Sequence, residues 1–174
     1  MQTLKELTQH QHQLAEQHKF TQALLQKRLP VGAYSTYLAN QFLQYYKLEF
    51  CARELLQPKP ELLRSHKLYK DFLELQPQFT TIFTSTVEYC KHVNALPQQK
   101  LWAHIYTKHL GDLYGGQLLA SRVPGSAKSY VFEDRPGLIA WIREHVNTTL
   151  AAEANWCFQQ TIKLFDEIAY EYDL

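Results

Sequence analysis

The stretch HIYTKHLGDLYGGQLLAS, residues 104–121, contains three glycines within an otherwise strong helical pattern. Each glycine in a helix interior costs about 1 kcal/mol relative to alanine, so these glycines need a reason other than helix stability. Gly111 and Gly115 are four residues apart and share a helical face, and Gly116 follows them. This spacing often marks a close helix crossing, but a flat ligand can use the same bare backbone. The acid Asp112 between the glycines favours the ligand.

Proline and glycine divide the whole chain into long segments of helical composition. These segments comprise residues 3–28, 33–56, 59–75, 78–94, 98–122 and 137–170. Strong helix formers are frequent in most of them, and the period-two alternation of strands is missing. No linker is long enough to divide the chain. We therefore predict an all-α fold and a single domain over residues 1–174.

The composition is that of a folded protein that does not bind nucleic acid. Apolar residues make up 45% and charged residues 20% of the 174 residues. A chain of this length buries about 70% of its unfolded surface, which leaves room for a core and a ligand cleft. The 18 lysines and arginines are scattered and the net charge is +1. Without a basic stripe, the long-range field of a nucleic-acid binder is missing.

The cysteines and the chain ends favour a cytoplasmic protein without a membrane anchor. Cys51, Cys90 and Cys157 lie far apart and form no CxxC pair, so neither a disulfide framework nor a thiolate metal site is expected. The N-terminal MQTLKELTQHQHQ lacks the apolar core of a signal peptide, and no window holds the roughly 18 apolar residues of a spanning helix.

Two distant motifs resemble the heme oxygenase family. YTKHLGDLYGGQ at residues 106–117 is similar to the distal-helix signature of that family, and KELTQHQHQLAE at residues 5–16 is similar to its proximal helix. Weaker similarity covers YYKLE at 45–49, IREHVNTTL at 142–150 and FQQTIKLFDEI at 158–168. The resemblance implies a heme oxygenase-like helical bundle that holds heme between the first helix and the glycine-rich helix. It also implies oxidative cleavage of heme, at the alpha-meso carbon, to biliverdin, carbon monoxide and ferrous iron.

The resemblance selects one of three histidines near the start of the chain. His10, His12 and His18 are each more often solvated or capping residues than ligands when considered alone. The family motif makes His12 the axial ligand of the heme iron, with a neutral imidazole whose other ring nitrogen needs a fixed acceptor. Glu16, one turn further along, matches the family position that orients this imidazole. The alternative is that Glu16 only faces solvent.

On the opposite side of heme, the resemblance gives roles to the glycines and to Asp112. The backbone of Gly111, Gly115 and Gly116 would limit how dioxygen can tilt above the heme, so selectivity for one meso carbon would be steric. Asp112 resembles the distal carboxylate that holds a water network and supplies protons through it. Tyr45 resembles a hydroxyl of that network, with ordinary packing as the alternative.

Cations are expected at the mouth of the cleft, where the heme propionates would lie. Lys5 and Arg143 match the family's positively charged positions and Tyr106 matches a hydroxyl that helps to bind propionate. Phe158 resembles a ring of the apolar heme pocket, with ordinary packing as the alternative.

The sequence also departs from the family pattern. Ile139 fills a second basic position one turn before Arg143, so propionate binding could use Arg135 or Lys128 instead. Tyr114 replaces a small residue before the paired glycines, and Lys108 replaces the commoner arginine. These departures concern heme affinity and regiochemistry more than the type of reaction.

Other classes of protein fit the sequence less well. A heme carrier on the same scaffold would keep His12 but would not need Asp112. A di-iron oxidase needs Glu-x-x-His sets, and the nearest pattern, Glu88 to His92, is spaced four apart. A thiaminase-like hydrolase needs a cysteine nucleophile in a recognisable motif, which is missing. Electrons must come from outside because no flavin or nicotinamide fingerprint is present, and a ferredoxin is expected rather than a P450-type reductase.

Overall fold

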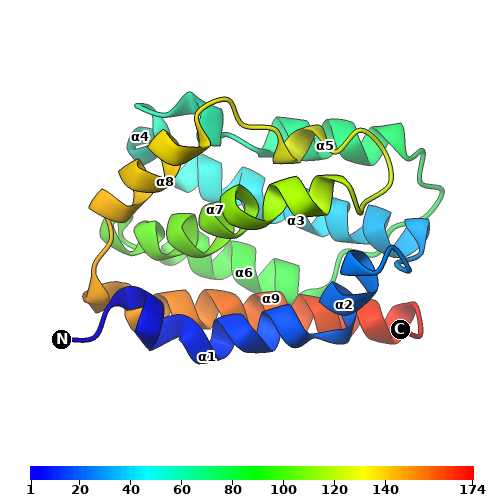
Figure 1. Cartoon of the computed structure of the whole chain (residues 1–174), viewed down its shortest axis with the longest axis horizontal. Coiled ribbons are helices and arrows are strands. Elements are labelled where there is room, and N and C mark those ends of the chain that lie inside the picture. Colours follow the sequence, from blue (N-terminus) through cyan, green and yellow to red (C-terminus); the bar gives the residue numbers. More distant parts are fainter.

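Three long helices, α3 (Val31–Cys51), α7 (Gln98–Ala120) and α9 (Ala151–Glu171), organise the fold in this computed structural model, which describes residues 1–174 (Figure 1). The shorter helices are α1 (Leu4–Gln17), α2 (Lys19–Leu25), α4 (Arg53–Leu56), α5 (Ser65–Glu74), α6 (Thr84–Ala95) and α8 (Arg135–Glu144). Three 3-10 turns complete the structure: η1 (Pro60–Leu62), η2 (Lys128–Tyr130) and η3 (Thr148–Leu150). There is no strand, so the predicted all-α fold is confirmed.

The first predicted helix is in fact two helices, because His18 interrupts it. Thr3 and Glu6 form a capping box at the start of α1. His18 then adopts an extended conformation, and its Nδ1 accepts a hydrogen bond from the backbone of Phe20 at 3.0 Å, which caps α2. The prediction of one helix over 3–28 is therefore wrong at this point, because a histidine cap is not among the usual sequence signals.

The last predicted helix, over 137–170, also divides into two. Asn147 is extended and its side chain accepts a hydrogen bond from the backbone of Thr149, which starts η3 and leads into α9. Three other boundaries also differ from the prediction. Ala52 separates α3 from α4, and α5 and α6 begin later than the composition predicted, at Ser65 and Thr84. The glycine-rich segment, predicted over 98–122, is confirmed as one helix, α7.

Helix α9 is the common support of both parts of the expected site. Helix α1 lies along α9 in the same direction, since Asn155 donates to the carbonyl of Leu7 at 3.1 Å and His18 lies 3.0 Å from Asp166 (Figure 1). Helix α7 also packs on α9. The main core cluster lies around α7 and includes Leu101, Ile105 and Leu113, which are fully buried. No helix is both long and apolar enough to cross a membrane.

Candidate functional site

His12 on α1 presents a free ring nitrogen at the surface of the helix pair α1 and α9. Its Nδ1 lies 3.5 Å from Oε2 of Glu16, and its side chain is 44% exposed. Phe158 of α9 contacts the imidazole edge to face, with ring centroids 5.6 Å apart. Because Nδ1 faces Glu16, Nε2 remains available to a ligand.

The other two histidines of the first segment are less suited to bind a ligand. His10 is exposed and has no hydrogen-bond partner within the chain. His18 uses both ring nitrogens, because Nδ1 caps α2 and Nε2 lies 3.0 Å from Oδ1 of Asp166. The structure therefore favours His12 among the three.

The glycines of α7 divide into two kinds. A Cβ atom added to Gly111 would meet nothing within 4 Å, and one added to Gly115 would meet only Leu119 of the same helix, at 3.6 Å. A Cβ atom on Gly116 would lie 3.1 Å from the ring of Tyr130 in η2. Gly111 and Gly115 thus leave backbone uncovered, whereas Gly116 allows α7 to pack closely on η2. The first two provide the bare surface that a flat ligand such as heme requires.

Asp112 is held by two partners that approach from different elements. The hydroxyl of Tyr45 on α3 donates a hydrogen bond to Oδ2 of Asp112. Nη1 of Arg64 donates to the same oxygen at 2.6 Å. Burial, reinforced by the charge of Asp112, raises the pKa of Tyr45 well above its usual value, so this hydroxyl keeps its proton and acts as a donor. The carboxylate is therefore held in position by a hydroxyl donor and a cation.

Arg64 is a residue of the site that the sequence did not reveal. It is almost fully buried, and its guanidinium lies 5.4 Å from the ring of Tyr45 and 5.0 Å from the ring of Phe132. Burial lowers the pKa of Arg64, but Asp112, Tyr45 and Tyr130 together outweigh it and the net change is upward. Its backbone, at the start of α5, is anchored by the carboxylate of Glu49 in the YYKLE motif. No motif marks Arg64, which is 48 positions from Asp112.

Lys108, which stands where arginine is commoner, points into the protein. Its Nζ donates to the side-chain oxygens of Gln41 and Gln44 at 3.0 and 2.8 Å, and it lies over the rings of Tyr45 and Tyr89 at 5.0 and 5.1 Å. Burial lowers the pKa of Lys108. Lys108 therefore stabilises the position of α3 and of the Tyr45 ring. It makes no direct contact with the carboxylate of Asp112.

The predicted propionate-binding residues lie on three different helices and do not contact one another. Lys5 is exposed near the start of α1, and Tyr106 is partly buried on α7 against the main core cluster. Arg143 on α8 lies 5.5 Å from the ring of Tyr114, so this bulky ring is turned toward α8.

The residues considered as substitutes for the missing second cation have different surroundings. Arg135 is already engaged, because its Nε donates to the carbonyl of Leu113 at 2.8 Å. Lys128 is exposed, and Ile139 packs against the main core cluster. Of the two candidates, Lys128 is thus the one with a free side chain.

Comparison with known proteins agrees with this fold. The sequence model of the heme oxygenase family matches residues 1–164. The chain is 25% identical to a heme oxygenase of Guillardia theta, over 97% of this chain and 86% of that protein. It is 32% identical to heme oxygenase 2 of Synechocystis sp., over 68% of this chain and 53% of that protein.

Two solved structures share the fold. Heme oxygenase-1 of Synechocystis sp., solved in complex with heme, superimposes with a TM-score of 0.84 at 23% identity, covering 97% of this chain and 91% of that one. A heme oxygenase of Leptospira interrogans superimposes with a TM-score of 0.81 at 24% identity, covering 94% of this chain and 97% of that one.

The fold and the site together define an all-helical protein with an imidazole on one helix and a bare glycine backbone on another. The chain belongs to the heme oxygenase family, and at this level of description its activity is heme degradation.

Proposed function

We propose that this chain, as one domain over residues 1–174, opens heme at the alpha-meso carbon to biliverdin, carbon monoxide and ferrous iron. The observation that carries the proposal is the pairing of a free Nε2 on His12 with uncovered backbone at Gly111 and Gly115. Both helices are positioned by α9. The donor and the bare backbone fit an iron porphyrin, which needs one axial nitrogen ligand and a flat surface.

On the proximal side, His12 binds the heme iron through Nε2. The carboxylate of Glu16 lies 3.5 Å from Nδ1, where it favours the tautomer and the ring orientation that leave Nε2 to the ligand and makes the imidazole a stronger ligand. Phe158 holds the edge of the imidazole and forms part of the apolar wall of the cleft.

On the distal side, the chain controls space and protons. Heme supplies, when bound, the iron at which dioxygen is activated. The backbone at Gly111 and Gly115 restricts the room above the macrocycle, and this steric restriction sets the carbon that is attacked. Gly116 allows α7 to pack closely on Tyr130, and this contact sets the position of α7 relative to heme. Asp112 orients water and passes protons through it, while Tyr45 and Arg64 hold the carboxylate still.

Lys5, Tyr106 and Arg143 bind the propionates at the mouth of the cleft. They lie on α1, α7 and α8, so a ligand that they share would be held by three helices. Lys128, whose side chain is exposed in η2, is the remaining candidate for the cation that Ile139 does not supply.

The electrons come from a ferredoxin in the cytoplasm. The chain contains no flavin or nicotinamide fingerprint, so a separate donor has to dock near the heme edge. The donor is a testable part of the proposal, because a ferredoxin and a P450-type reductase can be compared side by side.

A heme carrier on the same fold is the competing function. A carrier needs the His12 ligand but has no use for a distal carboxylate held by two buried partners. The arrangement of Asp112, Tyr45 and Arg64 therefore favours the enzyme.

The two functions are separated by titrating the purified protein with hemin and then adding reduced ferredoxin, a P450-type reductase with its nucleotide, or ascorbate under air. An enzyme gives a saturable Soret band that decays into the broad red absorbance of biliverdin. A carrier keeps its Soret band, and a protein that binds no hemin contradicts both functions. Product analysis by chromatography then identifies the meso carbon.

A further inference from the structure

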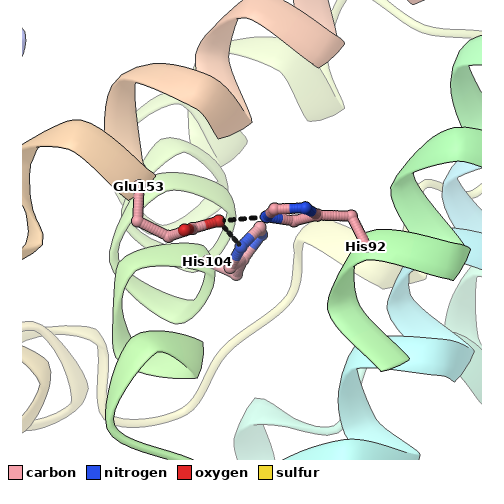
Figure 2. A group of neighbouring side chains, drawn as sticks. All are labelled: His92, His104 and Glu153. Atoms are coloured by element: carbon pink, nitrogen blue, oxygen red, sulfur yellow. Dashed lines mark hydrogen bonds and ion pairs between the residues drawn. The ribbon is translucent and has the colours of Figure 1, made fainter. Parts of the chain in front are cut away.

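A cluster of two histidines and one glutamate lies outside the proposed heme site. His92 on α6, His104 on α7 and Glu153 on α9 point toward one another from three helices (Figure 2). Oε1 of Glu153 lies 2.5 Å from Nε2 of His92 and 3.0 Å from Nε2 of His104. All three potential ligand atoms lie within 4.8 Å of one another.

Each imidazole is oriented by a further aromatic neighbour. The Nδ1 of buried His104 lies 3.1 Å from the hydroxyl of Tyr89, which leaves its Nε2 directed at the cluster. His92 stacks on Trp156, with ring centroids 3.7 Å apart. Ligand histidines typically have their second nitrogen fixed by such an outer partner. The Tyr89 contact therefore resembles the support of a metal ligand as well as the packing of a core residue.

The cluster is reachable from solvent on one side only. The side chain of His104 is fully buried and that of Glu153 is 10% exposed, but the side chain of His92 is 32% exposed. An ion could enter past His92 and would keep one coordination position facing water.

We propose that His92, His104 and Glu153 bind one divalent transition-metal ion of the zinc or ferrous type. Two imidazoles and one carboxylate are the protein ligands of open zinc sites and of non-heme ferrous sites. A tetrahedral ion with bonds of about 2.1 Å sets its ligand atoms about 3.4 Å apart. The two Glu153–histidine separations, 2.5 and 3.0 Å, are shorter than this value, so the side chains would have to rotate slightly apart to admit the ion.

The ion would connect three helices that also form the main core. Ala103 beside His104 and Ala154 beside Glu153 belong to the buried cluster, and α6 packs on α9 directly. Binding to the folded state alone raises stability according to the ratio of free ion to dissociation constant. The site shares no residue with the proposed heme site, so either proposal can fail without the other.

The test uses calorimetric titration and thermal unfolding of the purified protein with Zn²⁺, and separately with Fe²⁺ under argon. We expect one equivalent to bind and the unfolding temperature to rise. His92→Ala should abolish both effects, and Tyr89→Phe should weaken binding about 10- to 100-fold. His66→Ala, at an exposed histidine, and His12→Ala should each retain full binding.

Anomalous diffraction from a zinc-soaked crystal makes the test independent of how the variants fold. A peak between His92, His104 and Glu153 supports the proposal. The absence of saturable binding, or equal binding by His92→Ala, would overturn it and leave the cluster as a hydrogen-bonded ion pair.

Discussion

Nη1 of Arg64 lies 2.6 Å from Oδ2 of Asp112, so a nearly fully buried cation faces the carboxylate of the distal helix. Removing one member of such a pair leaves the other charge without compensation, which typically costs about 3–5 kcal/mol when both charges are buried. Because Asp112 keeps some access to solvent, we expect Arg64→Met to lower the free energy of unfolding by about 3 kcal/mol. Urea unfolding of the heme-free protein measures this change.

A double-mutant cycle with Asp112→Asn checks the cause. The loss caused by Arg64→Met should be smaller when Asp112 is already neutral. Arg53→Met, at an exposed arginine, serves as the control and should change stability by no more than about 0.5 kcal/mol. Additive effects in the cycle would show that Arg64 acts through packing and not through Asp112.

Replacing Asp112 by alanine should separate heme binding from heme cleavage. His12 and the glycine backbone remain, so we expect an unchanged Soret band in the Asp112→Ala variant. Without the carboxylate that orders water, heme should be diverted to peroxidase-like oxidation of added phenols, and biliverdin should fall at least about tenfold. Absorption spectroscopy and a phenol assay measure the two outcomes. Normal biliverdin yield would remove Asp112 from the mechanism.

His12→Ala should weaken heme ligation and abolish turnover, because His10 has no partner that orients its ring and both ring nitrogens of His18 are already engaged. The Soret position and the hemin affinity provide the measurement. His10→Ala is the matched control and should resemble the unmodified protein. An unchanged spectrum in His12→Ala would reassign the ligand to His10 or His18.

Gly111→Ala and Gly116→Ala should have opposite effects on stability. The new Cβ meets no atom at position 111, so Gly111→Ala should stabilise the helix by about 1 kcal/mol, or roughly 2–4 °C in the unfolding temperature. At position 116 the Cβ lies 3.1 Å from Tyr130, and the resulting strain should cost about 1–3 kcal/mol. Gly111→Ala should nevertheless slow heme cleavage or change its regiochemistry. A stabilised variant with unaltered products would show that the backbone at Gly111 does not face heme.

His109 should make the protein less stable in acid. Burial, reinforced by the charge of Arg64, lowers the pKa of His109 to about 4. The unfolded chain, with a histidine pKa of about 6.5, binds the proton more readily, so stability is lost as the pH falls from about 6.5 toward 4.

Between pH 7 and pH 5 we expect the unmodified protein to lose about 2 kcal/mol more stability than His109→Phe. The loss of the hydrogen bond from Nε2 of His109 to the carbonyl of Leu62 affects the variant at both pH values and cancels in this comparison. Urea unfolding at the two pH values is the measurement. Equal losses would mean that His109 is not the titrating group.

The sequence predicts the parts of this fold that follow from local patterns. Helix α7 matches its predicted range closely because prolines and glycines mark its ends. The interruptions at His18 and Asn147 were missed because a side-chain cap on an internal residue leaves little trace in composition. Similarly, motifs led to His12 and Asp112 because their helices have a recognisable pattern.

Residues that are brought together only by tertiary packing cannot be predicted from local sequence patterns. Arg64 meets Asp112 only because α5 begins where Glu49 anchors it. The cluster of His92, His104 and Glu153 contains one residue from each of three helices, so the spacing of residues within a helix cannot predict it. The propionate-binding roles of Lys5, Tyr106 and Arg143 remain predictions, since the residues have no mutual contact that would test them.

The parallel packing of α1 on α9 also constrains how the chain acquires its structure during synthesis. Residues 4–17 meet their main partner only when residues 151–171 have been made. At about 5–20 residues per second, the ribosome needs roughly ten seconds to add the intervening chain. During this interval the segment that carries His12 lacks its main packing surface, so the imidazole and its aromatic neighbour Phe158 meet only after α9 has been made. Heme can then be captured only after translation of α9, and a nascent chain that is stalled earlier should bind none.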